Sequence, residues 1–186
     1  MNLLEVTGFL FGIAGVYLTL RENVWCFPVG IINVILSLFL FYDQKLYADA
    51  SQQSVYIFLL TYGWWQWLHG GFKKSLTITK SSSKLLLNCL MIWISGTFLL
   101  GSLLHKYTDA STPWPDSAAT ILSFIAQWMV AKKKLENWIL WMVVNLAYIA
   151  IYIYKDLSLY AILFFIYLIL AIAGYVNWKK QLHHAG

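Results

Sequence analysis

The chain alternates between long apolar runs and short polar breaks. Seven apolar runs can be distinguished, at residues 5–20, 24–42, 49–68, 85–104, 118–131, 137–154 and 157–178. An α-helix needs about 20 residues to cross about 30 Å of hydrocarbon, and most of these runs approach that length. Segments such as ILSLFLFY lack the period-two alternation of a membrane β-strand. The pattern therefore predicts an all-α integral membrane protein with seven transmembrane helices.

The amino-acid composition also indicates a membrane environment. Of the 186 residues, 60% are hydrophobic and 11% are charged, and the mean hydropathy is +0.65. A soluble domain carries about 25% charged residues, so a water-soluble globular fold is excluded. Residues 1–4 hold no Lys or Arg, and no small-residue cleavage site follows. We therefore expect the first run to be a helix of the mature protein.

Basic residues divide unevenly between the two sides of the membrane. With seven spans, the amino-terminal side holds Lys45, Lys106 and Lys155, and the other side holds the remaining ten of the 13 Lys and Arg residues. The positive-inside rule places the richer side in the cytoplasm. We therefore expect the amino terminus outside and the carboxyl terminus inside.

The same basic loops account for the net charge of +5. Cytoplasmic Lys and Arg face anionic membrane lipid, so membrane lipid is the expected partner and no nucleic acid is needed. The longest loop, residues 69–84, is rich in Gly, Ser and Lys and is typical of a flexible linker.

An internal repeat relates the two halves of the chain. Six residues of residues 22–67 recur in residues 136–178 at an offset of 111 to 113. The pairs are Asn33 with Asn145, Tyr42 with Tyr154, Tyr47 with Tyr160, Tyr56 with Tyr167, Gly63 with Gly174, and Trp67 with Trp178. One helix separates the halves, so both cross the membrane in the same direction. We predict a single transporter-like domain, residues 1–186, with repeat one at 5–68, a connector at 85–104 and repeat two at 116–178.

Polar and aromatic side chains share one face of the sixth predicted helix. Trp138, Trp141 and Asn145 lie at positions i, i+3 and i+7, which bring them to one side. In repeat-built transporters the substrate lies near the midplane where the repeats meet, and polar groups inside the helices mark it. We therefore expect these three residues to bind the substrate.

The fifth helix carries a second such face, with Asp116, Thr120, Ser123 and Gln127 at i, i+4, i+7 and i+11. The candidates contributed by the second and third helices are Asn33, Gln53 and Tyr56. The predicted substrate-binding set is Trp138, Trp141, Asn145, Gln127, Ser123, Gln53, Tyr56, Asn33 and Asp116.

Each candidate also has a structural explanation. Amides and hydroxyls in membrane helices often bond a neighbouring helix, Trp138 lies where an interfacial aromatic belt is expected, and Asp116 lies at a helix start that favours a carboxylate. Cys26 and Cys89 have no metal or redox spacing and are expected to pack as small apolar residues. We predict no metal and no cofactor.

The chemistry of the predicted site suits a flat, hydroxylated solute. No Lys, Arg, Glu or His lies deep within a predicted span, whereas proton relays and ion-coupled pumps normally keep an ionisable group there. Indole faces would also attract a cationic ring. Facilitated transport without ion coupling fits this interior.

Several strings of the chain resemble the PnuC family of bacterial vitamin transporters. They are GIINV, KLYADA, YGWWQW, PDSAATILSFIAQWMVAKK and ENWILWMVVN, and the resemblance runs from about residue 5 to about residue 178. It implies a seven-helix 3+1+3 fold similar to that of SWEET proteins, with Trp138, Trp141 and Asn145 holding the substrate. It further implies a location in the bacterial cytoplasmic (inner) membrane and import of nicotinamide riboside by facilitated diffusion with alternating access. Trapping by a cytoplasmic kinase, a role in NAD biosynthesis and a homotrimer are also implied.

The resemblance is compatible with two vitamins, nicotinamide riboside and thiamine. A close branch of the family carries thiamine, which is also cationic, flat and hydroxylated. The stretch NVWCFPVG before Asn33 departs from many nicotinamide riboside carriers. An enzyme is not expected, because the chain lacks HExxH and places no His near Cys26 or Cys89. A structural or signalling membrane protein is the distant alternative, although it would not need polar faces in both repeats.

Overall fold

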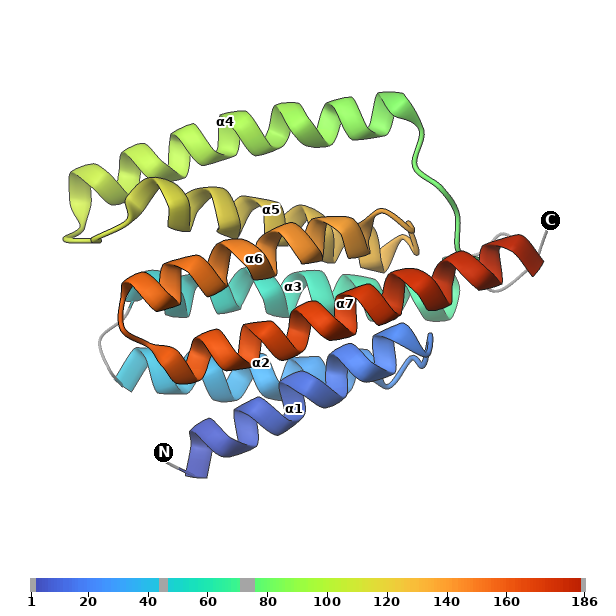
Figure 1. Cartoon of the computed structure of the whole chain (residues 1–186), viewed down its shortest axis with the longest axis horizontal. Coiled ribbons are helices and arrows are strands. Elements are labelled where there is room, and N and C mark those ends of the chain that lie inside the picture. Colours follow the sequence, from blue (N-terminus) through green and yellow to red (C-terminus); the bar gives the residue numbers. More distant parts are fainter. Residues whose placement is uncertain (1–2, 44–46, 71–75, 185–186) are drawn as a thin grey trace.

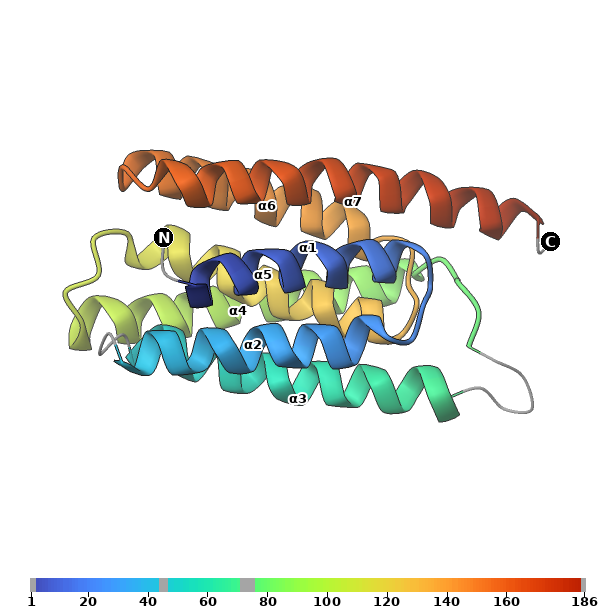
Figure 2. The same ribbon diagram turned by 90° about the horizontal axis from the view of Figure 1, so that it is seen from below.

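A computed structural model describes residues 3–43, 47–70 and 76–184 and contains seven α-helices in those ranges, as predicted (Figure 1). The helices are α1 (Leu3–Leu20), α2 (Cys26–Asp43), α3 (Tyr47–His69), α4 (Ser83–Tyr107), α5 (Pro113–Ala131), α6 (Asn137–Tyr154) and α7 (Ser158–His184). They lie roughly side by side as a bundle (Figure 2). Three of the lysines used for orientation, Lys45, Lys73 and Lys74, lie outside the described residues.

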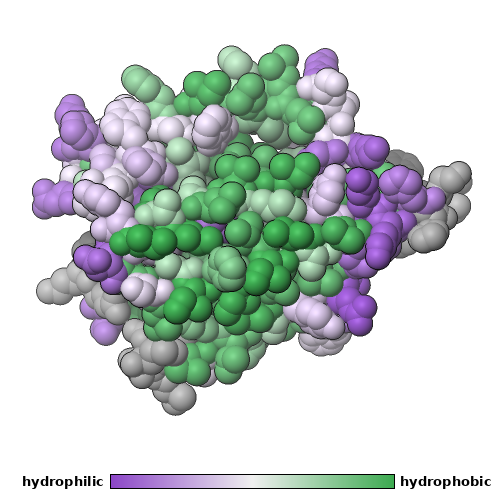
Figure 3. All heavy atoms as spheres, in the orientation of Figure 1, coloured by the Kyte–Doolittle hydropathy of each residue, from purple (hydrophilic) through white to green (hydrophobic). Residues whose placement is uncertain are grey.

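On the face shown in Figure 3, apolar residues cover the middle of the bundle and polar residues gather toward its two ends. By length and hydropathy, α2, α4, α6 and most of α7 are each sufficient to cross a bilayer. The helix α5 is less apolar because much of it is covered by protein: it contacts α3, α4 and α6 and buries nine of its residues. By contrast, α4 turns many large apolar side chains outward, as expected for contact with lipid.

The helix contacts reproduce the predicted parallel repeat. Contacts of α1 with α2 and of α2 with α3 correspond to those of α5 with α6 and of α6 with α7. The repeats then meet twice in equivalent ways, α3 on α5 and α7 on α1. Among the described helices, α4 contacts only α5. The architecture is therefore two helical triplets joined by two equivalent interfaces, with a connector leaning on repeat two.

Three turns end helices in the same unusual way. Glu22, Lys133 and Asp156 have positive φ angles of 54°, 48° and 56° and follow α1, α5 and α6. In each turn the next residue's N–H donates to the carbonyl oxygen five residues earlier, at 2.8–2.9 Å. This is a Schellman motif, whose left-handed position usually holds glycine. Two of these residues, Glu22 and Lys133, stand 111 positions apart and so occupy the same place in the two repeats.

The described end of the loop between α3 and α4, residues 76–82, is held by hydrogen bonds and is not a free linker. Its residue Thr79 receives an N–H bond from Leu135 and donates its own N–H to the Lys133 carbonyl oxygen, both at 3.0 Å. Ser81 donates its N–H and its hydroxyl to Glu136, at 2.9 and 2.7 Å. Residues 76–82 are therefore tied to the α5–α6 turn, because that turn offers free backbone groups and a carboxylate.

Close helix packing within repeat two depends on Gly174. A Cβ atom at this position would lie 2.6 Å from three ring atoms of Trp138, whose side chain is 1% exposed and has little room to move. We expect Gly174→Ala to lower the unfolding free energy by about 1–3 kcal/mol. The control is Gly8→Ala, where a Cβ would meet its nearest atom at an ordinary 3.6 Å. Thermal unfolding in detergent measures both, and equal melting temperatures would contradict the packing argument.

Candidate functional site

Trp138, Trp141 and Asn145 all lie on α6, and their environments differ. Trp138 is 1% exposed and packs edge-on against Trp178 of α7, with ring centroids 5.4 Å apart. Trp141 is half-buried at the margin of the same apolar cluster. Asn145 is 3% exposed, and its amide has no hydrogen-bond partner in the described part of the chain. A buried amide without a protein partner is costly in a membrane unless a ligand or water uses it.

Among the described residues, the buried indole N–H of Trp138 likewise has no hydrogen-bond partner, and neither does that of Trp178. The residue equivalent to Trp178 in repeat one, Trp67, donates its N–H to the Val130 carbonyl oxygen at 3.1 Å. The three rings form a continuous cluster, because Trp67 and Trp178 lie 6.3 Å apart. This cluster therefore holds two buried N–H groups, those of Trp138 and Trp178, that can donate a hydrogen bond to a ligand or to water.

Tyr56 and Ser123 meet where α3 crosses α5. The Tyr56 hydroxyl donates to the Ser123 hydroxyl at 2.5 Å, and Ser123 donates to the Thr120 carbonyl oxygen at 2.7 Å. The Thr120 hydroxyl lies 3.4 Å from the hydroxyl of Tyr148 on α6. This chain of hydroxyls links the two repeats through α3, α5 and α6.

The two predicted glutamines lie beside this hydroxyl chain. Gln127 is half-buried one helical turn from Ser123 toward the α5–α6 turn, and Gln53 is half-buried on α3. Neither amide has a hydrogen-bond partner in the described residues. The neighbouring Gln52, which is not in the predicted set, is the glutamine that reaches the Tyr56 hydroxyl.

Asn33 of repeat one is the equivalent of Asn145, and it lies near the other contact between the repeats, that of α7 with α1. Its amide lies beside Gly8 and Gly12 of α1, and the Tyr167 hydroxyl of α7 approaches the same Gly12. Since Gly12 and Tyr167 stand 111 positions from Ser123 and Tyr56 respectively, one contact repeats the other with glycine in place of serine. The bundle thus contains two pseudo-equivalent polar regions, one at each contact between the repeats.

Depth separates Asp116 from the other candidates. Ser123 and Asn145 each lie 8 residues from the ends of α5 and α6 that meet at their common turn, or about 12 Å at 1.5 Å per residue. Asp116 lies at the far end of α5, about 22 Å away by the same rise, and accepts from Lys155 at 3.0 Å and from Thr112 at 2.9 Å. The structure therefore gathers Asn145 and Ser123 at mid-depth and leaves Asp116 in an ion pair at one end.

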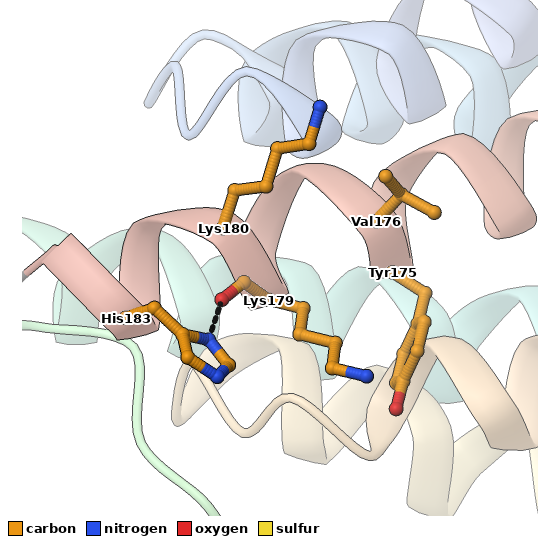
Figure 4. Close-up of a pocket in the computed structure, with 5 residues that line it drawn as sticks. All are labelled: Tyr175, Val176, Lys179, Lys180 and His183. Carbon is orange, nitrogen blue, oxygen red and sulfur yellow. Dashed lines mark hydrogen bonds between the residues drawn. The ribbon is translucent and has the colours of Figure 1, made fainter.

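The pocket at the end of α7 does not belong to this region. It has a volume of about 420 Å³ and is lined by Tyr175, Val176, Lys179, Lys180 and His183, all on α7 (Figure 4). His183 Nδ1 donates to the Lys179 carbonyl oxygen at 2.7 Å. It is a shallow basic surface of one helix, and it contains none of the predicted substrate residues.

Sequence reasoning did not include three residues that the structure brings to the candidate site. They are Tyr148, Tyr167 and Trp178. Two of these, Tyr167 and Trp178, are repeat partners of Tyr56 and Trp67, so symmetry alone could have suggested them. Within the described ranges, no group of three or more His, Cys, Asp or Glu side chains could hold a metal ion.

Comparison with known families covers nearly the whole chain. The profile of the family described as "Nicotinamide mononucleotide transporter" matches residues 2–180. A solved structure described as the vitamin B3 transporter PnuC has a TM-score of 0.80 at 22% identity, over 98% of this chain and 83% of that one. That likeness shows a common fold.

Three curated relatives also match most of this chain. The nicotinamide riboside transporter PnuC of Escherichia coli is 21% identical over 100% of this chain and 89% of its own length. The riboflavin/roseoflavin transporter RibM of Streptomyces davaonensis is 23% identical over 94% of this chain and 83% of its own length. PnuC of Neisseria mucosa is 26% identical over 84% of this chain and 65% of its own length. These relatives are transporters and not enzymes, as the sequence predicts for this chain.

Proposed function

The chain belongs to the nicotinamide mononucleotide transporter family, of which PnuC proteins are members, and on this premise we propose that it imports nicotinamide riboside. The observation that carries the proposal is the face of α6 that holds Trp138, Trp141 and Asn145. It combines indole rings with a buried amide that no other described residue bonds. Indole rings stack on and attract a cationic pyridinium ring, and the amide can pair with a carboxamide or a ribose hydroxyl.

Facilitated diffusion with alternating access is the mechanism we propose. The repeats contact each other at two equivalent interfaces, α3 on α5 and α7 on α1, and small rotations at such interfaces can open one end while closing the other. The candidate residues near mid-depth are neutral amides, hydroxyls and indoles, so none of them supplies a charged group for coupling to an ion gradient. Net uptake then requires a cytoplasmic kinase that phosphorylates the vitamin and so traps it.

A bacterial inner-membrane location with the amino terminus outside belongs to the same proposal. It is supported by the basic residues that gather at the end of the bundle carrying the α1–α2 and α5–α6 turns. This basic end holds Arg21, Lys80, Lys84, Lys132, Lys133, Lys134, Lys179 and Lys180. We also propose a homotrimer, on the family resemblance, which light scattering of the purified protein tests.

Riboflavin is a second candidate substrate, because RibM matches the chain over most of both lengths. A flavin is also a flat ring system with a hydroxylated chain, but it carries no fixed positive charge. Thiamine, the alternative substrate given by the sequence analysis, is the third candidate. Titration calorimetry of purified protein against the three vitamins separates them, and we expect tightest binding of nicotinamide riboside.

Counterflow in proteoliposomes tests the facilitator mechanism. Vesicles loaded with unlabelled nicotinamide riboside should accumulate the labelled compound transiently, without any ion gradient, because exchange through a uniporter needs none. Collapsing the proton gradient and membrane potential with ionophores should change the initial rate less than twofold. A strict requirement for either gradient would contradict uncoupled transport, and absence of counterflow with every vitamin would contradict the proposed function.

A further inference from the structure

Two repeat-equivalent residues join the repeats at the basic end. The Lys133 ammonium lies 2.8 Å from the Glu22 carboxylate, and their side chains are only 11% and 20% exposed. The Glu22 residue is in the α1–α2 turn of repeat one, and Lys133 is in the α5–α6 turn of repeat two. The other ion pair of the described residues, Lys155 with Asp116, lies within repeat two. One ion pair therefore bridges the repeats, and it does so at one end of the bundle.

The backbone at both positions favours glycine, yet the chain places a charge there. Glu22 and Lys133 each hold the left-handed position of a Schellman motif, with φ of 54° and 48°. A side chain is disfavoured in this conformation, and persistent backbone strain of this kind is a pointer to function. The two strained residues contact each other, so the turns and the ion pair act as one unit.

Further contacts fix Lys133 in place. Its ammonium lies 4.5 Å from the centroid of the Trp67 ring on α3, which adds a cation–π attraction to repeat one. Its carbonyl oxygen accepts the Thr79 N–H at 3.0 Å, which holds its turn from the other side. Trp67 in turn contacts Phe27 and Trp178, with centroids 5.0 and 6.3 Å away. The ion pair thus closes the bundle over the tryptophan cluster.

Neighbouring polar contacts reinforce the same end. The Trp67 N–H donates to Val130 at 3.1 Å, and the Asn177 amide donates to the Leu20 carbonyl oxygen at 2.6 Å. Both bonds also join one repeat to the other. Any rotation that opens this end must break the ion pair, whose charges have little water around them to replace the lost partner.

We infer that Glu22 and Lys133 are positioning residues of the transport step, forming a latch that closes the basic end of the carrier and must release for the substrate to leave there. This inference rests on the proposed transport function but not on the identity of the vitamin. The latch acts on the movement of the repeats, so it affects the transport rate and leaves the substrate contacts unchanged.

Charge reversal with rescue tests the latch. Glu22→Lys and Lys133→Glu should each lower the initial rate of vitamin uptake by at least about tenfold, because two like charges then face each other. The double variant Glu22→Lys/Lys133→Glu should restore at least about a third of the wild-type rate. Binding in calorimetry should stay within about threefold of wild type throughout. Normal uptake by both single variants, or no rescue by the double variant, would overturn the inference.

Two variants control for folding and for surface charge. Lys133→Gly suits the left-handed backbone, so a loss of uptake in this variant is due to the missing side chain and not to misfolding. The adjacent Lys132 lies over the Tyr62 ring, whereas Glu22 pairs with Lys133. Lys132→Glu should therefore transport normally. If Lys132→Glu lowered uptake as much as Lys133→Glu, a general charge effect would explain the result instead.

An accessibility measurement separates the latch from the transport proposal. In a background of Cys26→Ala and Cys89→Ala, Gln127→Cys places a thiol beside the hydroxyl chain of α5. Adding Lys133→Glu should speed its labelling by an impermeant maleimide from the basic side at least about tenfold, whereas Lys132→Glu should not. This readout needs no substrate. Unchanged labelling would contradict the latch even if transport is confirmed, and faster labelling with no transport of any vitamin would contradict only the proposed function.

Discussion

Replacement of Asn145 by leucine is expected to weaken nicotinamide riboside binding by at least about 30-fold. The amide is 3% exposed and has no protein partner in the described residues, so a bound ligand can use both its donor and its acceptor. Two neutral hydrogen bonds of about 1 kcal/mol each amount to this factor, at 1.4 kcal/mol per tenfold. Leucine has the same branched arrangement of side-chain heavy atoms and removes a buried polar group, so the unfolding free energy should stay unchanged or rise. Calorimetry and thermal unfolding measure the two quantities.

Asn177 provides the matched control. Its amide donates to the Leu20 carbonyl oxygen at 2.6 Å, so this asparagine has a structural partner. Asn177→Leu should lower the unfolding free energy by about 1 kcal/mol or more and leave affinity within about threefold. If Asn145→Leu behaved like Asn177→Leu, Asn145 would be a structural residue and the site on α6 would be wrong.

The two tryptophans of the α6 face should respond differently to alanine. Trp138 is 1% exposed and packs on Gly174 and Trp178, so Trp138→Ala leaves a large cavity and should cost about 3–5 kcal/mol of stability. Trp141 is half-buried, so Trp141→Ala should cost much less stability. It should nevertheless weaken binding by about tenfold or more, because a ring face that stacks on the ligand is lost.

Affinity and melting temperature, measured on the same preparations, separate the two roles. Trp141→Phe keeps an aromatic face and should recover much of the affinity that Trp141→Ala loses. Wild-type affinity in Trp141→Ala, for all three vitamins, would remove Trp141 from the site. A ligand that protects Trp138→Ala against unfolding would show that the destabilised variant still forms a binding site.

Much of the fold was predictable because each membrane helix is a run of apolar residues that the sequence shows directly. All seven predicted runs became helices, but their ends moved. The run predicted at 118–131 begins at Pro113, since proline is tolerated in the first turn and Asp116 favours a helix start. The last helix continues past residue 178 to His184 with polar residues that hydropathy does not count. The order of residues 76–82 was not predictable, because it depends on Glu136, 55 residues away.

The candidate site was less predictable than the fold. Helical periodicity shows which residues share a face of one helix, but it does not show how neighbouring helices are rotated against each other. Tyr56 and Ser123 were both expected at the site, whereas their direct bond across 67 residues was not. Asp116 shares a face with Ser123, yet the length of α5 separates it from the tryptophans. The bridge from Glu22 to Lys133 joins turns that carry no hydropathy signal.

The way α4 leans on α5 has a practical consequence for spectroscopy. Because α4 contacts no other described helix, it should move together with repeat two as a rigid body during transport. A spin label at Leu99, which is 64% exposed on α4, would then report that motion from outside the pathway. Paired with a label on the exposed side of α2, for example at Phe39, it would give a molecular ruler between the repeats. Such a ruler could follow the carrier's cycle in a membrane without altering a residue that holds substrate.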